Sequence, residues 1–89
     1  MDSKRIQDLE KKYDLNCKIF SHKELIEECK NQSEMQGTDV LSIGVSVGYG
    51  DGYFSLIRVE NFIKFLESEI IEYEKQLKEI NKQLEVENE

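Results

Sequence analysis

The chain has 89 residues, of which 35% are charged, and its formal net charge is −7. This length suits one small domain with a limited core, which oligomerisation would help to stabilise. The negative charge argues against direct binding of DNA or RNA, because an acidic surface repels phosphates.

The chain also lacks the usual signs of membrane insertion or secretion. No apolar run approaches the roughly 18–20 residues that cross a bilayer, so we expect no membrane contact. The first residues, MDSKRIQDLEKKY, contain no apolar segment of the kind found in signal peptides. Cys17 and Cys29 do not form the cysteine pattern of a disulfide-rich secreted domain. We therefore expect a cytoplasmic protein with free thiols.

Residues 3–14 have the pattern of a short helix. Ile6, Leu9 and Tyr13 follow the i, i+3, i+7 spacing of one narrow apolar stripe. The basic residues of this segment alternate with acidic ones, so the segment is nearly neutral. We expect this helix to pack on the core through its stripe rather than to act as a basic arm.

Residues 15–36 are expected to form a strand and then a second helix. In LNCKIF (15–20) apolar and polar side chains alternate, which is typical of a strand with one buried face. Ser21 and Glu24 have the spacing of a capping box at the start of a helix. This helix would run from about residue 22 to 35 with an apolar face of Leu25, Ile26 and Cys29. Gly37 then suits the left-handed position that ends a helix.

Residues 39–58 are expected to form an antiparallel β-hairpin. Leu41, Ile43, Val45 and Val47 alternate with smaller or polar residues, and YFSLIRV follows after a glycine-rich segment, GYGDG. The Asp-Gly pair in that segment is a strong hairpin signal. LNCKIF is a candidate third strand, and the hairpin needs helices against its apolar face because an isolated hairpin is marginally stable in water.

Residues 59–89 have the heptad spacing of a long coiled-coil helix, about 46 Å in length. Phe62, Phe65 and Ile71 widen the apolar face of its first half. We therefore expect residues 1–58 to form a small α+β core, with the first half of the long helix packed on it and the second half mediating oligomerisation. The predicted oligomer interface comprises Ile63, Leu66, Ile70, Tyr73, Leu77, Ile80 and Leu84.

Charge on this helix favours some pairings over others. In a parallel dimer Glu69 would face Glu74 of the second copy, and each such exposed contact between like charges costs a few tenths of a kcal/mol. An antiparallel pairing avoids the contact, so we favour an antiparallel homodimer, or a higher oligomer, over a parallel dimer. Pairing with the N-terminal helix, whose charges are mixed, avoids it as well.

The residues that could carry chemistry do not form a recognisable catalytic or metal-binding set. Cys17, His22 and Cys29 have neither the spacing nor the number of a structural zinc site, and one histidine leaves no catalytic triad. The segment Gly48–Gly52 joins two strands rather than a strand and a helix, which disfavours phosphate binding. We expect no enzyme, no cofactor and no metal. Aromatic residues at a hairpin tip can form protein contacts, so the partner-binding candidates are Tyr49, Asp51 and Tyr53.

Three functions remain open at this point. The first is a non-enzymatic acidic protein-binding module that self-associates through its C-terminal helix. An inhibitor carried by a phage or mobile element and directed at a basic, nucleic-acid-handling host protein would fit this description. The second is a structural or assembly protein whose oligomer is the function. The third is a small-ligand binder at the glycine-rich hairpin.

Overall fold

The protein is a pair of long helices joined by a β-hairpin, in a computed structural model that describes residues 3–46, 48, 50 and 52–87. The elements in chain order are α1 (Ser3–Gln36), β1 (Val40–Val45), β2 (Tyr53–Arg58) and α2 (Val59–Glu87). This arrangement confirms the predicted α+β class, the hairpin and the long C-terminal helix. Neither helix, over the residues described, has an apolar stretch long enough to cross a membrane.

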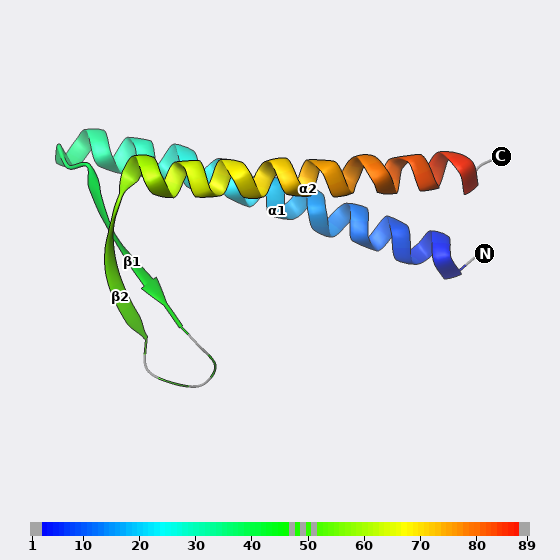
Figure 1. Ribbon diagram of the computed structural model, residues 1–89, viewed down its shortest axis with the longest axis horizontal. Coiled ribbons are helices and arrows are strands. Elements are labelled where there is room, and N and C mark those ends of the chain that lie inside the picture. The colour runs from blue at the N-terminus through cyan, green and yellow to red at the C-terminus, as the bar shows by residue number, and fades with distance from the viewer. Residues whose placement is uncertain (1–2, 47, 49, 51, 88–89) are drawn as a thin grey trace.

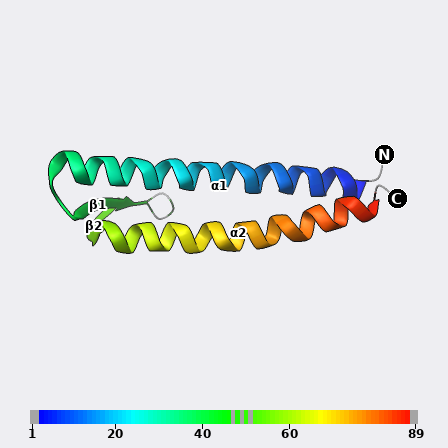
Figure 2. The same ribbon diagram turned by 90° about the horizontal axis from the view of Figure 1, so that it is seen from above.

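The molecule is elongated. The two helices run antiparallel side by side, and the N- and C-terminal ends lie together at one end of the pair (Figures 1 and 2). The hairpin leaves the opposite end at an angle to the helices, so β1 and β2 extend away from the helix pair in Figure 1. The molecule measures 54 × 31 × 16 Å and has a radius of gyration of 17.4 Å, whereas a compact domain of this length would have about 12 Å.

The predicted strand at residues 15–20 is wrong, because α1 is one continuous helix from Ser3 to Gln36. Leu15 and Ile19 are two residues of an alternating pattern, but they are also separated by one helical turn. Both are buried in the structure, whereas Cys17 between them is exposed. The sheet accordingly has two strands in the described part of the chain. Ser21 lies inside α1 and caps no helix.

The face of α1 that packs against α2 also differs from the prediction. The N-terminal stripe of Ile6, Leu9 and Tyr13 is exposed, so its predicted packing on the core is wrong. The buried residues of α1 follow a different line, at intervals of three, four or seven positions: Asp8, Leu15, Ile19, Ile26 and Cys29. The same line carries half-buried polar residues, among them Lys12, His22 and Ser33.

The main core lies between the middle parts of the two helices. Ile19 and Ile26 of α1 pack with Leu66 and Ile70 of α2 in one buried cluster. Partly buried side chains of α2 pack against this cluster, namely Phe62, Ile63, Tyr73 and Leu77. Phe65 and Ile71, which were expected to widen the core-facing side of α2, are exposed.

Polar side chains of α1 surround Tyr73 in the interface between the helices. The Tyr73 ring meets the His22 ring edge to face at 5.4 Å between centroids, and Lys18 Nζ lies 5.7 Å from the Tyr73 centroid. Lys18 also pairs with Asp14 at 3.0 Å. The hydrogen bond to Asp14 raises the pKa of Lys18. The ammonium group lies over the Tyr73 ring, which is the arrangement of a cation–π contact.

The end of α1 and the base of the hairpin are fixed by backbone hydrogen bonds. Gly37 has a φ of +62°, and the Thr38 N–H donates to the Ser33 carbonyl, which is the long hydrogen bond of a Schellman motif. The predicted C-cap at Gly37 is thereby confirmed. The Val59 N–H donates to the Asp39 carbonyl at 2.7 Å, so α2 begins directly where the hairpin closes. The strands pair antiparallel, from Val40 opposite Arg58 to Val45 opposite Tyr53.

Candidate protein-binding surfaces

The residues predicted to form an oligomer interface lie on the side of α2 that faces α1. Leu66 and Ile70 belong to the buried core cluster, and Leu84, near the end of α2, is also buried. The remaining predicted residues are half-buried: Ile63, Tyr73, Leu77 and Ile80. Within one chain, α1 therefore already covers the heptad positions that the sequence assigned to a second copy.

The inner face of the β-hairpin closes an apolar hollow against the helices. Leu41, Ile43 and Ile57 are half-buried on this face. A hollow of about 330 Å³ lies between β1, α1 and α2, and its apolar lining is Leu25, Cys29, Leu41, Ile43 and Phe62. These contacts anchor the hairpin near its base, as the sequence predicted for Leu41 and Ile43.

The outer face of the hairpin, formed by Val40, Phe54 and Leu56, is open to solvent. Side chains alternate between the two faces of a strand, so Phe54 and Leu56 point away from the inner face that holds Ile57. Their exposed fractions are 80% and 73%. The Phe54 ring lies over Gly44 on the paired strand, where an added Cβ would come within 2.9 Å of the ring. Glycine at this position leaves the room that the ring occupies.

The predicted contact residues at the hairpin tip are only partly covered by the structure. Tyr49 and Asp51 lie outside the described residues. Tyr53 is 70% exposed, as a contact residue should be. Phe54 and Leu56 were not among the predicted contact residues, although YFSLIR carries large apolar residues on both of its alternating sets. Only one of the two sets can face the helices. The pattern therefore already indicated that large apolar side chains of the other set would be exposed.

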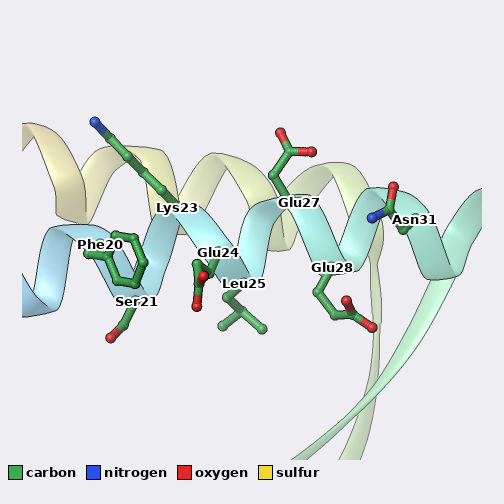
Figure 3. A pocket seen from close by; sticks show the side chains of 8 residues that line it. All are labelled: Phe20, Ser21, Lys23, Glu24, Leu25, Glu27, Glu28 and Asn31. Carbon is green, nitrogen blue, oxygen red and sulfur yellow. The ribbon is translucent and has the colours of Figure 1, made fainter.

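A second exposed apolar surface runs along α1. We call Ile6, Leu9, Tyr13 and Phe20 the α1 stripe; all four side chains are exposed. In Figure 3, α2 passes behind α1 and Phe20 stands on the outward side. Next to Phe20 an open hollow of about 800 Å³ is lined by Leu25 and by several charged side chains, including Lys23, Glu24 and Glu27.

The two cysteines lie in different surroundings and should differ in reactivity. Cys17 is exposed and Cys29 is buried; burial raises the pKa of the Cys29 thiol, and the nearby Glu28 raises it further. A higher pKa leaves less of the reactive thiolate at neutral pH. We expect a thiol reagent to modify one cysteine rapidly in the native protein and both in denaturant. Mass spectrometry after a brief reaction should find the label on Cys17, and equal labelling of both thiols would contradict the described burial of Cys29.

The described residues contain no group of three or more side chains able to hold a metal ion. His22 packs against Tyr73 between the helices, away from both Cys17 on the surface and the hairpin. The exposed apolar surfaces that could bind a partner are therefore the outer hairpin face and the α1 stripe.

Comparison of the chain with protein-family models, curated proteins and solved structures gave no match.

Proposed function

We propose that this protein is a non-enzymatic protein-binding module that contacts its partner through the outer hairpin face. The observation that supports this most strongly is the exposure of Phe54 and Leu56 on a hairpin that projects from the helix pair (Figure 1). Exposed apolar groups of this size on a projecting element mark interaction surfaces in soluble proteins. Aromatic side chains are also enriched among the residues that dominate binding energy.

The hairpin offers main-chain groups in addition to side chains. Its sheet has two strands in the described part of the chain, so each strand has an edge without a neighbouring strand. An extended segment of another protein can add to such an edge through main-chain hydrogen bonds. The outer hairpin face would then bury every second side chain of that segment. These side-chain contacts would make binding specific for the sequence of the segment.

The net charge of −7 supports a basic partner. Opposite net charges accelerate encounter and help to exclude acidic competitors. Proteins that handle nucleic acids carry basic surfaces, and an acidic inhibitor of such a protein, of the kind carried by phages and mobile elements, is the form of the proposal that the charge favours. Binding that stays unchanged up to about 1 M salt, where charges are screened within about 3 Å, would contradict this part of the proposal.

Site-specific photocrosslinking tests the proposed surface. A photoreactive amino acid at position 56 should crosslink to a partner in cells that contain it. The same amino acid at position 86 is the matched control, because Val86 of α2 is also apolar and 68% exposed. The double variant Phe54→Ser/Leu56→Ser should lose that partner and keep its helical circular dichroism. Equal crosslinking from positions 56 and 86, or none from 56, would refute the proposed surface.

An assembly role is the second candidate, and the α1 stripe is the observation that favours it. If the oligomer itself is the function, light scattering should find a large ring or filament rather than a closed dimer. A small closed oligomer would instead favour the protein-binding module over the assembly role.

A further inference from the structure

The α1 stripe is an apolar surface that none of the described helices and strands covers. Ile6, Leu9, Tyr13 and Phe20 succeed one another at intervals of three, four and seven residues, so they lie along one side of the helix. The residues that face α2 lie on another line of the same helix. α1 thus has two apolar faces, and α2 occupies one of them.

Tyr13 of the stripe contacts a neighbouring side chain of the same helix. Tyr13 and Cys17 are one turn apart, and a hydrogen bond between their side chains is the main cause that raises the pKa of Tyr13. Tyr13 is nevertheless 73% exposed and Phe20 is 62% exposed. Each aromatic side chain can bury about 150–250 Å² against a partner, so most of the area that this surface offers is still in contact with water.

The charges beside the stripe indicate what covers it. With 3.6 residues per turn, Arg5 lies along one flank of the stripe and Glu10 along the other, about 140° apart around the helix. A second copy that packs in parallel brings Glu10 of each copy against Arg5 of the other, on both sides of the two-fold axis. An antiparallel copy does not bring these two side chains together.

We propose that two copies of this chain pair in parallel through the α1 stripe and form a four-helix stalk. The contact covers residues 6–20, a length of about 21 Å at 1.5 Å per residue. Beyond Phe20 the same side of α1 carries Glu24 and Glu27 (Figure 3), where two parallel copies place like charges together. The contact therefore ends near Phe20. An interface of this length with two aromatic side chains per copy suits a dissociation constant of about 1–100 µM.

A parallel pairing places both β-hairpins at the same end of the stalk. Each hairpin leaves its helix pair at the end opposite the termini (Figure 1), and parallel copies share that end. If the proposed function is right, the dimer presents two outer hairpin faces to one partner and gains affinity from bivalency. The dimer itself does not depend on that function, and its test uses the purified protein alone.

Sedimentation equilibrium over a range of concentrations tests the pairing. Wild-type protein should change from a 10.5 kDa monomer to a species of twice that mass. Tyr13→Glu/Phe20→Glu should remain monomeric with unchanged helical circular dichroism, since both side chains are exposed. Phe54→Glu on the hairpin is the matched control and should dimerise as the wild type does. A wild-type monomer at every concentration up to about 1 mM, or a stripe variant that still dimerises, would overturn the proposal.

Charge reversal tests the parallel orientation. Arg5→Glu should weaken the dimer at least tenfold, and Arg5→Glu/Glu10→Arg should restore it, because position 5 of each copy faces position 10 of the other. Within one chain the two positions are too far apart around α1 to pair. Restoration therefore reports contact between copies. A dimer that the second change does not restore would refute the parallel orientation.

A distance measurement provides a second, independent reading of orientation. In the variant Ser3→Cys/Cys17→Ser a spin label can be placed at the N-terminal end of α1, while Cys29 is buried. Parallel copies bring the two labels to the same end, within about 20 Å. Antiparallel copies centred on Tyr13 would separate them by about 30 Å along the helix axis. The longer distance, or a stripe that binds only a different protein while the chain stays monomeric, would overturn the proposal.

Discussion

Replacing Leu66 by alanine is expected to lower the free energy of unfolding by about 2–5 kcal/mol. Leu66 is 3% exposed and packs with Ile19 and Ile26 of α1 and with Ile70 of its own helix. Truncation loses the transfer free energy of the removed groups and leaves a cavity between two helices that cannot close it without shifting. A domain of this size has little stability in reserve, so the variant should be largely unfolded near 37 °C.

Urea denaturation followed by circular dichroism measures this effect. The matched control is Leu56→Ala, which removes the same groups from a side chain that is 73% exposed. The control should change stability by no more than about 0.5 kcal/mol. Both proteins are compared at a concentration that keeps the chain monomeric. Equal effects at positions 56 and 66 would contradict the described core.

Replacing Asp8 by leucine is expected to stabilise the protein by about 1–3 kcal/mol. Asp8 is 7% exposed and lies on the α2-facing line of α1. Its Oδ2 atom is buried and has no hydrogen-bond partner among the residues that the structure describes. A buried carboxylate oxygen without a partner loses its hydration and gains nothing in return. Leucine would remove that cost and add apolar contact with α2.

Asp14→Leu is the matched control for this prediction. Asp14 lies on the same helix but is exposed and paired with Lys18 at 3.0 Å. Its replacement removes a surface ion pair, whose contribution is at most about 1 kcal/mol, and should not raise the melting temperature. If Asp8→Leu destabilises the protein instead, the Asp8 carboxylate must have a stabilising partner and the described burial of Oδ2 would be incomplete.

The elements that depend on local chemistry were predictable from the sequence. Gly37 ends α1 because its left-handed φ requires glycine, and that signal lies within a few residues. The hairpin follows from two alternating segments around a glycine-rich connection. The long C-terminal helix follows from a heptad pattern that continues without a break from Val59 to Leu84.

The continuity of α1 was not predictable from local pattern alone. LNCKIF satisfies the alternation of a strand and the four-residue spacing of a helix equally well, and only burial against α2 separates the two. The line of α1 that faces α2 includes Asp8, Lys12 and His22, so its apolar periodicity is interrupted. The regular stripe of Ile6, Leu9 and Tyr13 was therefore taken as the buried face, whereas it lies on the surface.

The candidate surfaces were only partly predictable for a similar reason. Tyr53 was expected to be exposed near the hairpin tip and is exposed. Phe54 and Leu56 were missed because their exposure depends on which face of the hairpin the helices cover, a tertiary relation that alternation does not specify. The heptad residues of α2 were assigned to a second copy because the predicted N-terminal helix, residues 3–14, was too short to cover the whole of α2. Pairing with that helix was nevertheless one of the arrangements that the charges allowed.

The central feature of this structure is that α1 covers the heptad face of α2 within one chain. Methyl NMR tests it most directly, in a sample that mixes labelled and unlabelled protein. We expect contacts between the methyl groups of Ile26 and Ile70, which share the core cluster, to arise within single labelled chains and to be absent from a spectrum filtered for contacts between chains. If these contacts appear only in the filtered spectrum, α2 pairs with a second copy and the described closure by α1 is wrong.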